Sequence, residues 1–209
     1  MPKISVSQMA REGIAVCTSP ALGWGNKYRV ILYDAKLLSK LIKQHKELEA
    51  AERKHSYKRG AERFKVTALI YGELEANDVE YYGTDGELFC HAEICSSKAR
   101  DGYGPVMYEI MMATCKKPLS PDCTLSRRAR AVWKKFYERP DVKNVQRIRN
   151  GSYWSGPEAY HFCYELRRKL RFEGLKKNHE KVLKLAGNAQ RQKQFVLRTL
   201  DSSTAAFHE

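Results

Sequence analysis

No apolar run in this sequence approaches the roughly 20 residues that a membrane-spanning helix requires. The first residues, MPKISVSQMAREG, lack the apolar core and small-residue cleavage site of a signal peptide. The six cysteines include no Cys-x-x-Cys pair, and several lie in apolar runs where a reduced thiol acts as a small hydrophobic group. We therefore expect no membrane span, no metal site and a reducing, cytoplasmic location.

Complete motifs for several enzyme classes are also missing. No Gly-Lys-Ser or Gly-Lys-Thr follows a glycine-bearing loop, so a P-loop nucleotide kinase is not predicted. Neither a zinc-ligand pattern nor a serine-hydrolase motif occurs. The 209 residues contain no repeat or low-complexity tract, and 43% of them are hydrophobic, as in a globular protein.

Positive charge is plentiful but confined to one part of the chain. Residues 1–123 carry 18 basic and 16 acidic side chains, whereas residues 124–198 carry 20 and 6. The whole excess of +14 therefore lies in 75 residues. Solvated helix faces explain only part of such a surplus, so an anionic partner such as DNA or RNA is expected to bind through residues 124–198.

The first 150 residues mix strand and helix patterns. Asp34 is placed to cap a helix that follows it, because Leu37, Leu38, Leu41 and Ile42 then fall on one face. Thr84-Asp85-Gly86 has the composition of a hairpin turn. We predict strands near residues 14–17, 28–33, 63–76 and 141–148, two more within 79–97 on either side of this turn, and helices near 35–55, 106–115 and 124–139.

The remaining residues have a helical pattern. Ser155 and Glu158 can form a capping box around Pro157, and an apolar stripe follows at helical spacing. The stripe consists of Ala159, Phe162, Cys163, Leu166 and Leu170. After Gly174 a second helix is expected from about His179 to Leu200. We therefore divide the chain into a core, residues 1–150, and a basic helical extension, residues 151–209, which packs on the core or binds a protein partner or second copy.

The strongest local signal is a predicted strand that runs through the loop KARDGYGP into a helix. Backbone N–H groups at the start of a helix can hold a pyrophosphate, and Gly102 and Gly104 would let the backbone approach it closely. The same pattern also fits a glycine turn that only joins a strand to a helix. Two glycines do not make the dinucleotide-binding fingerprint.

Together with YGPVMYE, LSPD and the A-x-x-VW-x-x-(F/Y)Y-x-R-x-DV spacing, this region resembles the second half of the GCN5-related N-acetyltransferase fold. Residues 79–148 are similar to small acetyltransferase-like proteins encoded by bacteriophages. The resemblance implies an α+β, three-layer-like fold with a mixed central sheet flanked by helices. It also implies that acetyl-CoA binds through Ile94, Cys95 and Ser96 of the central strand and Arg100, Asp101, Gly102, Tyr103 and Gly104 of the loop. Ala99 stands where the family has Arg or Gln, and Lys98 or Arg100 could supply that charge.

The resemblance further implies an acyl-CoA-dependent N-acyltransferase, in which an amine attacks the thioester directly. The positive charge suggests that this amine belongs to an anionic or nucleic-acid-linked substrate. The family's thiolate-protonating tyrosine falls on Trp133, whose indole cannot act as an acid, so Tyr137, one helical turn on, is the substitute candidate. His91 and Glu93 share a face of the predicted central strand and are candidate general bases. Side chains of this kind on a strand can equally be structural.

A second function remains open, in which the chain keeps the fold without the chemistry. It would be a bacteriophage structural protein, in the host cytoplasm or packed in the virion, that binds nucleic acid. The candidate contacts interleave with aromatic residues and comprise Arg127, Arg128, Arg130, Lys134, Lys135, Arg147, Arg149, Arg167, Arg168 and Lys169.

Overall fold

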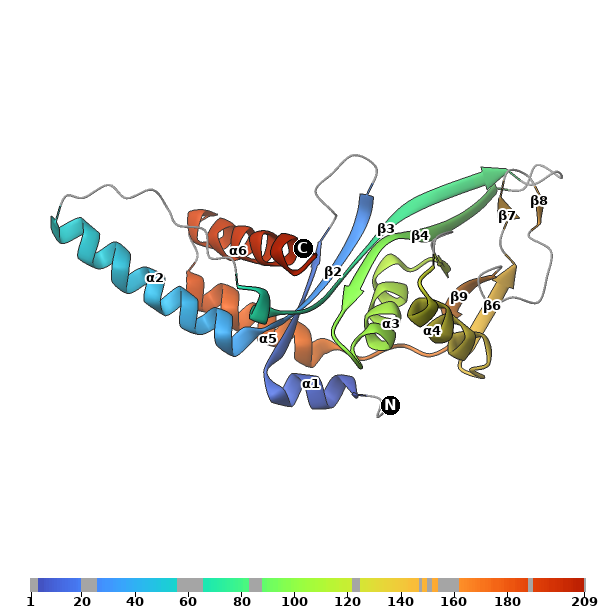
Figure 1. Cartoon of the computed structure of the whole chain (residues 1–209), viewed down its shortest axis with the longest axis horizontal. Coiled ribbons are helices and arrows are strands. Elements are labelled where there is room, and N and C mark those ends of the chain that lie inside the picture. The colour runs from blue at the N-terminus through green and yellow to red at the C-terminus, as the bar shows by residue number, and fades with distance from the viewer. Residues whose placement is uncertain are drawn as a thin grey trace. The chain divides into compact units, whose positions relative to one another are not determined.

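The computed structural model describes residues 4–19, 26–55, 66–82, 88–121, 125–146, 148–149, 152–153, 162–187 and 190–208 (Figure 1). The helices are α1 (Val6–Glu12), α2 (Ala35–His55), the short 3-10 turn η1 (Thr67–Leu69), α3 (Gly104–Cys115), α4 (Arg127–Tyr137), α5 (Glu173–Ala186) and α6 (Gln190–His208). The strands are β1 (Ile14–Ser19), β2 (Asn26–Asp34), β3 (Ile70–Tyr82), β4 (Leu88–Ala99), β5 (Leu119–Ser120), β6 (Val142–Gln146), β7 (Ile148–Arg149), β8 (Ser152–Tyr153) and β9 (Phe162–Leu166). Among these described helices, none is long and apolar enough to cross a bilayer.

The main sheet is mixed and has the strand order β1-β2-β3-β4-β5-β9-β6. Strand β4 pairs with β5 in parallel, whereas β9 pairs antiparallel with both β5 and β6. Strands β7 and β8 form a separate antiparallel pair. The predicted α+β class and mixed sheet are confirmed.

The chain forms two compact units. Unit 1 contains Thr18–Val30 and Glu73–Arg171, and unit 2 contains Lys3–Cys17, Ile31–Gly72 and Phe172–Glu209. This division does not coincide with the expected boundary between residues 150 and 151. The physical reason is that β9 is part of the sheet, while α5 packs against α1, α2 and α6.

In unit 1, α3 packs against β4 and β9, and α4 packs against β6 (Figure 1). Helix α3 is apolar along most of its length, and its residues from Val106 to Met112 are buried. Helix α4 has one apolar face, which buries Trp133 and Phe136 against Tyr164 of β9, with ring centroids 4.9 and 6.4 Å from that of Tyr164. These rings form the aromatic core of the unit.

Unit 2 has a core of its own, built around Leu38, Ile42, Leu69, Val196 and Leu200. As predicted, Asp34 caps α2, and its Oδ1 atom accepts hydrogen bonds from the N–H groups of residues 36 and 37 at 2.8 and 2.9 Å. Gly174 lies inside α5, where a Cβ atom would stand 2.9 Å from the Cβ of Ala10. This glycine permits close packing of α1 on α5, and the prediction that it interrupts a helix was wrong.

The expected helix through residues 162–170 was also wrong, because residues 162–166 form β9. Both Cys163 and Tyr164 are buried, although consecutive strand residues face opposite sides of a sheet. A strand with both faces covered has no alternation of apolar and polar residues. The apolar residues of β9 therefore gave no strand pattern, and their helical spacing was a coincidence. The proposed capping box at Ser155 and Glu158 and the turn at residues 84–86 lie outside the described residues.

Two other elements have limits that differ from the predicted ones. Residues 67–69 form η1, so the strand predicted over residues 63–76 begins only at Ile70. The second C-terminal helix, expected from about His179, corresponds to two helices, α5 and α6.

Candidate functional site

Strands β4 and β5 run side by side over a short stretch. The described register pairs Ala92 with Leu119 and Glu93 with Ser120, and the N–H of Ala92 donates to the carbonyl of Pro118 at 2.9 Å. Strand β5 then ends, whereas β4 continues to Ala99. A space therefore opens beside the second half of β4.

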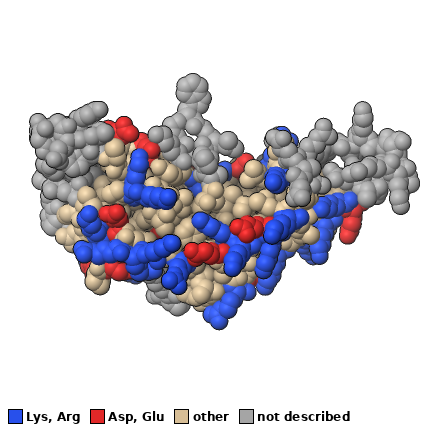
Figure 2. Space-filling model, turned by 180° about the vertical axis from the view of Figure 1, so that it is seen from behind, with Lys and Arg blue, Asp and Glu red and all other residues tan. Residues whose placement is uncertain are grey.

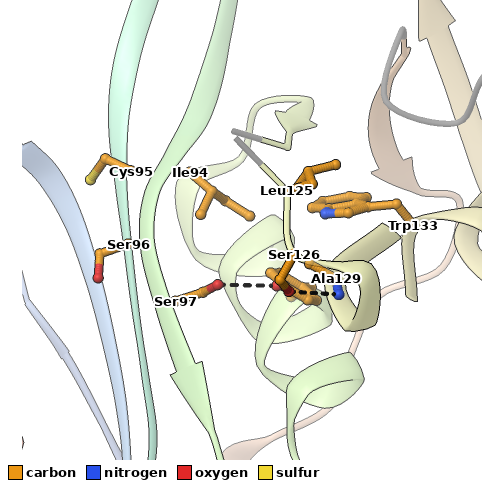
Figure 3. Close-up of a pocket in the computed structure, with 9 residues that line it drawn as sticks. Ile94, Cys95, Ser96, Ser97, Leu125, Ser126, Ala129 and Trp133 are labelled. Atoms are coloured by element: carbon orange, nitrogen blue, oxygen red, sulfur yellow. Dashed lines mark hydrogen bonds between the residues drawn. The ribbon is translucent and has the colours of Figure 1, made fainter. Parts of the chain in front are cut away.

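A cavity of about 160 Å³ occupies this space (Figure 3). Its walls come from the second half of β4, from α3, and from the start and first two turns of α4. The lining residues are Ile94, Cys95, Ser96, Ser97, Tyr108, Leu125, Ser126, Ala129 and Trp133. Pockets that enclose a drug-sized ligand measure roughly 300–1,000 Å³, so this cavity suits one end of a larger molecule. Three of its lining residues, Ile94, Cys95 and Ser96, are among those predicted to bind the cofactor.

Three polar groups lie in the cavity wall. The hydroxyl of Tyr108 donates to Ser97 Oγ at 3.3 Å. Ser126 caps α4 by accepting from the N–H of Ala129 at 3.2 Å (Figure 3). The third is the indole Nε1–H of Trp133, which has no hydrogen-bond acceptor among the described residues. Burial raises the pKa of Tyr108, with the hydrogen bond to Ser97 opposing it, so this hydroxyl stays protonated.

The loop after β4 leads directly into α3. Gly102 has φ +90°, a conformation that favours glycine, and the N–H of Tyr103 donates to the carbonyl of Arg100 at 3.1 Å. Gly104 is different: its φ is not positive, and a Cβ atom there would meet nothing within 4 Å. The space around the first residue of α3 is therefore open. Among the described residues, no side chain caps this helix, and its first turn carries no acidic residue.

Arg128 of α4 extends to this loop. Its Nη1 atom lies 3.2 Å from Asp101 Oδ1, with both side chains largely exposed. We predicted Arg128 as a nucleic-acid contact and Asp101 as a loop residue that binds the cofactor, and the structure brings the two together. An arginine here is placed to meet a phosphate at the loop.

The candidate bases His91 and Glu93 lie close together on β4. The Nε2 atom of His91 is 3.8 Å from Glu93 Oε2, and 5% and 20% of the two side chains are exposed. Neither residue lines the cavity, because both precede the point where β4 and β5 part. The structure therefore pairs them with each other but does not bring them to the cavity.

Tyr137 is not at the cavity either. It is the last residue of α4, is 36% exposed, and packs its ring on Phe162 at 5.1 Å between centroids. The tyrosine in the cavity wall is Tyr108 of α3, which the sequence reasoning missed. The available signal was its position one helical turn after Gly104, since residues four apart share a helix face.

The predicted nucleic-acid contacts fall into different surroundings. On α4, Arg127, Arg128, Arg130, Lys134 and Lys135 are all exposed, as are Arg167, Arg168 and Lys169 after β9. On the face of the molecule shown in Figure 2, Lys and Arg side chains clearly outnumber Asp and Glu side chains. Arg147 lies outside the described residues, and Arg149 belongs to β7.

Arg168 belongs to an ion-pair cluster with Glu109, Arg139 and Asp141. Arg139 binds Glu109 at 2.5 Å and Asp141 through two nitrogens at 2.8 and 2.6 Å, while Arg168 lies 2.9 Å from Asp141 and 3.2 Å from Glu109. Hydrogen bonds from the two guanidinium groups, chiefly that of Arg139, hold the pKa of Asp141 well below its usual range. This cluster joins α3 to the segments beside β6 and β9, which gives Arg168 a structural contact.

Among the described residues, no group of three His, Cys, Asp or Glu side chains is arranged to hold a metal ion. The comparisons with known proteins add no relative. No family model matches the chain, and no curated protein and no solved structure matches it either.

Proposed function

We propose that the protein is an acyl-CoA-dependent N-acyltransferase that transfers an acetyl or other short acyl group to an amine. The observation that carries the proposal is the cavity at the point where β4 leaves β5, next to the loop that opens α3. This is where the N-acetyltransferase resemblance implies that a thioester lies. The parallel pairing of β4 with β5 and the uncapped start of α3 support the same assignment.

The residues fit such a ligand in two parts. The N–H groups at the start of α3, the open space at Gly104 and the guanidinium of Arg128 suit a pyrophosphate. The cavity suits the acyl end, because its wall combines apolar side chains with a few polar groups. Ala99 supplies no charge at the position where the family has Arg or Gln, so Arg128 is the proposed replacement.

Acyl-CoA supplies a thioester, whose carbonyl carbon forms a C–N bond with the amine as its C–S bond breaks. The amine nitrogen gives up its proton to solvent water, because neither candidate base lines the cavity, and the departing sulfur gains a proton. Tyr108 is the proposed proton donor to the sulfur, since it lines the cavity and its raised pKa keeps it protonated. A backbone N–H of β4 beside the cavity is the proposed partner of the carbonyl oxygen.

The test is acetyl-CoA binding, measured by calorimetry on the wild type and on Gly104→Glu. A side chain at Gly104 enters open space, so this variant should fold, and a carboxylate at a helix start is not destabilising. The same carboxylate should repel the ligand's phosphates and abolish binding. Gln194→Glu adds an equal charge at an exposed site on α6 and should bind like the wild type. No binding of millimolar acetyl-CoA to the wild type would refute the proposal.

A second candidate is a nucleic-acid-binding protein without catalytic activity, which the exposed Arg and Lys side chains of α4 favour. It predicts binding of a fluorescent DNA or RNA oligonucleotide that weakens steeply as salt is raised. Binding should persist in Gly104→Glu and weaken in the double variant Lys134→Glu/Lys135→Glu. Binding that is absent at low salt would eliminate this candidate.

A further inference from the structure

Trp133 presents a buried hydrogen-bond donor to the cavity. The residue is 0% exposed and lines the cavity, and no described group accepts a hydrogen bond from its Nε1–H. In Figure 3 the indole nitrogen lies at the end of the ring nearer to Ile94, on the opposite wall. Leaving such a donor unsatisfied is costly, so an acceptor placed in the cavity would be favoured.

Neighbouring rings hold this indole in place. Its centroid lies 4.9 Å from that of Tyr108, 5.6 Å from that of Phe136 and 4.9 Å from that of Tyr164. A ring packed on three sides cannot turn its N–H toward solvent without disturbing the core. The donor is therefore fixed before a ligand arrives, as an effective transition-state contact requires.

Resting on the proposed function, we infer that Trp133 donates a hydrogen bond to the carbonyl oxygen of the bound thioester. This oxygen gains negative charge when the amine attacks, and a fixed N–H donor stabilises that charge. Trp133 thus has a contact with the reacting group that does not depend on proton transfer. Ile94, Leu125 and Ala129 form apolar wall around it, which suits a short acyl chain.

The experiment compares acetyl-CoA with CoA, which lacks the carbonyl. Calorimetry should show that Trp133→Phe binds acetyl-CoA about two- to tenfold more weakly than the wild type, the range for one net hydrogen bond, and binds CoA equally well. Phe136→Leu is the matched control, because Phe136 is buried beside Trp133 but does not line the cavity. It should weaken the two ligands equally or not at all.

A measurement on the wild type keeps the test valid if Trp133→Phe does not fold. In a ¹⁵N-labelled protein the indole N–H signal of Trp133 should move downfield with acetyl-CoA and stay in place with CoA. Trp24 and Trp154 account for the other indole signals, and replacing each by Phe assigns the third to Trp133. If acetyl-CoA binds but this signal does not move, the inference is wrong and the proposed function stands. If acetyl-CoA does not bind at all, both fall.

Discussion

Replacing Arg139 by methionine is expected to destabilise the protein by about 3 kcal/mol. Arg139 is the main partner of Glu109, whose side chain on α3 is only 3% exposed. Methionine keeps much of the aliphatic stem but removes the charge. The carboxylate of Glu109 would then remain in the interior without its shortest described ion pair, while Arg168 still lies 3.2 Å away.

The magnitude follows from the exposure of the two arginines. Breaking a buried ion pair by removing one partner costs about 3–5 kcal/mol, because the other charge is left without compensation. Arg168 is 47% exposed and retains part of the interaction, which places the loss near the lower limit. Arg168→Met should cost about 1 kcal/mol or less, since Arg139 still holds Glu109 and the lost pair is half in solvent.

The assay is a melting curve followed by circular dichroism. A loss of about 3 kcal/mol lowers the Tm of a chain of this size by roughly 6–12 °C. Adding Glu109→Leu to Arg139→Met should recover most of that loss, because the buried charge is removed with its partner. If Arg139→Met melts no earlier than Arg168→Met, or if the second substitution recovers nothing, the reasoning about Glu109 is wrong.

Three further predictions concern single side chains. Gly104→Ala should raise the free energy of unfolding by about 0.4–1 kcal/mol. Gly102→Ala, at φ +90°, should lower it by about 1–2 kcal/mol. Both are measured by urea denaturation, and equal effects of the two variants would contradict the open space at Gly104. Burial lowers the pKa of His179, with Glu180 opposing, so the unfolded chain takes up a proton first as the pH falls. The stability that His179 contributes should therefore be complete above about pH 6.5 and decline below it, and urea midpoints at about pH 7.5 and 5.5 should differ more for the wild type than for His179→Phe. Asp34→Ala should cost about 1 kcal/mol through the lost cap of α2, and a melting curve matching that of the wild type would show that the cap contributes nothing.

Local signals in the sequence predicted much of the fold. Asp34 was identified as a cap because its carboxylate needs only the next few residues to act, and the α2 pattern followed directly. The β4–loop–α3 order was also predictable, since a strand, a glycine loop and an apolar helix each have a local pattern. The place of Gly174 inside a helix and the strand β9 were not predictable, because each depends on residues far away in the chain. Gly174 packs closely on Ala10, and β9 pairs with β5 and β6.

The candidate site divides in the same way. Ile94, Cys95 and Ser96 line the cavity because of the position of β4 alone, and their binding of a cofactor stays a prediction. Tyr137 did not, because one helical turn along α4 moves a side chain from the cavity to the exposed end of the helix. The place of Arg128 beside Asp101 depends on how α4 lies against the loop, which no local pattern encodes.

Unit 2 draws its core from three separate segments, Lys3–Cys17, Ile31–Gly72 and Phe172–Glu209. A chain leaving the ribosome therefore exposes the apolar face of α2 until Val182, Val196 and Leu200 have been made. Such late contacts slow folding and leave a partly made chain open to aggregation or to capture by chaperones. For the same reason, a stop codon anywhere before α5 would remove α5 and α6. It would also leave the first helices of the unit without the residues that complete their core.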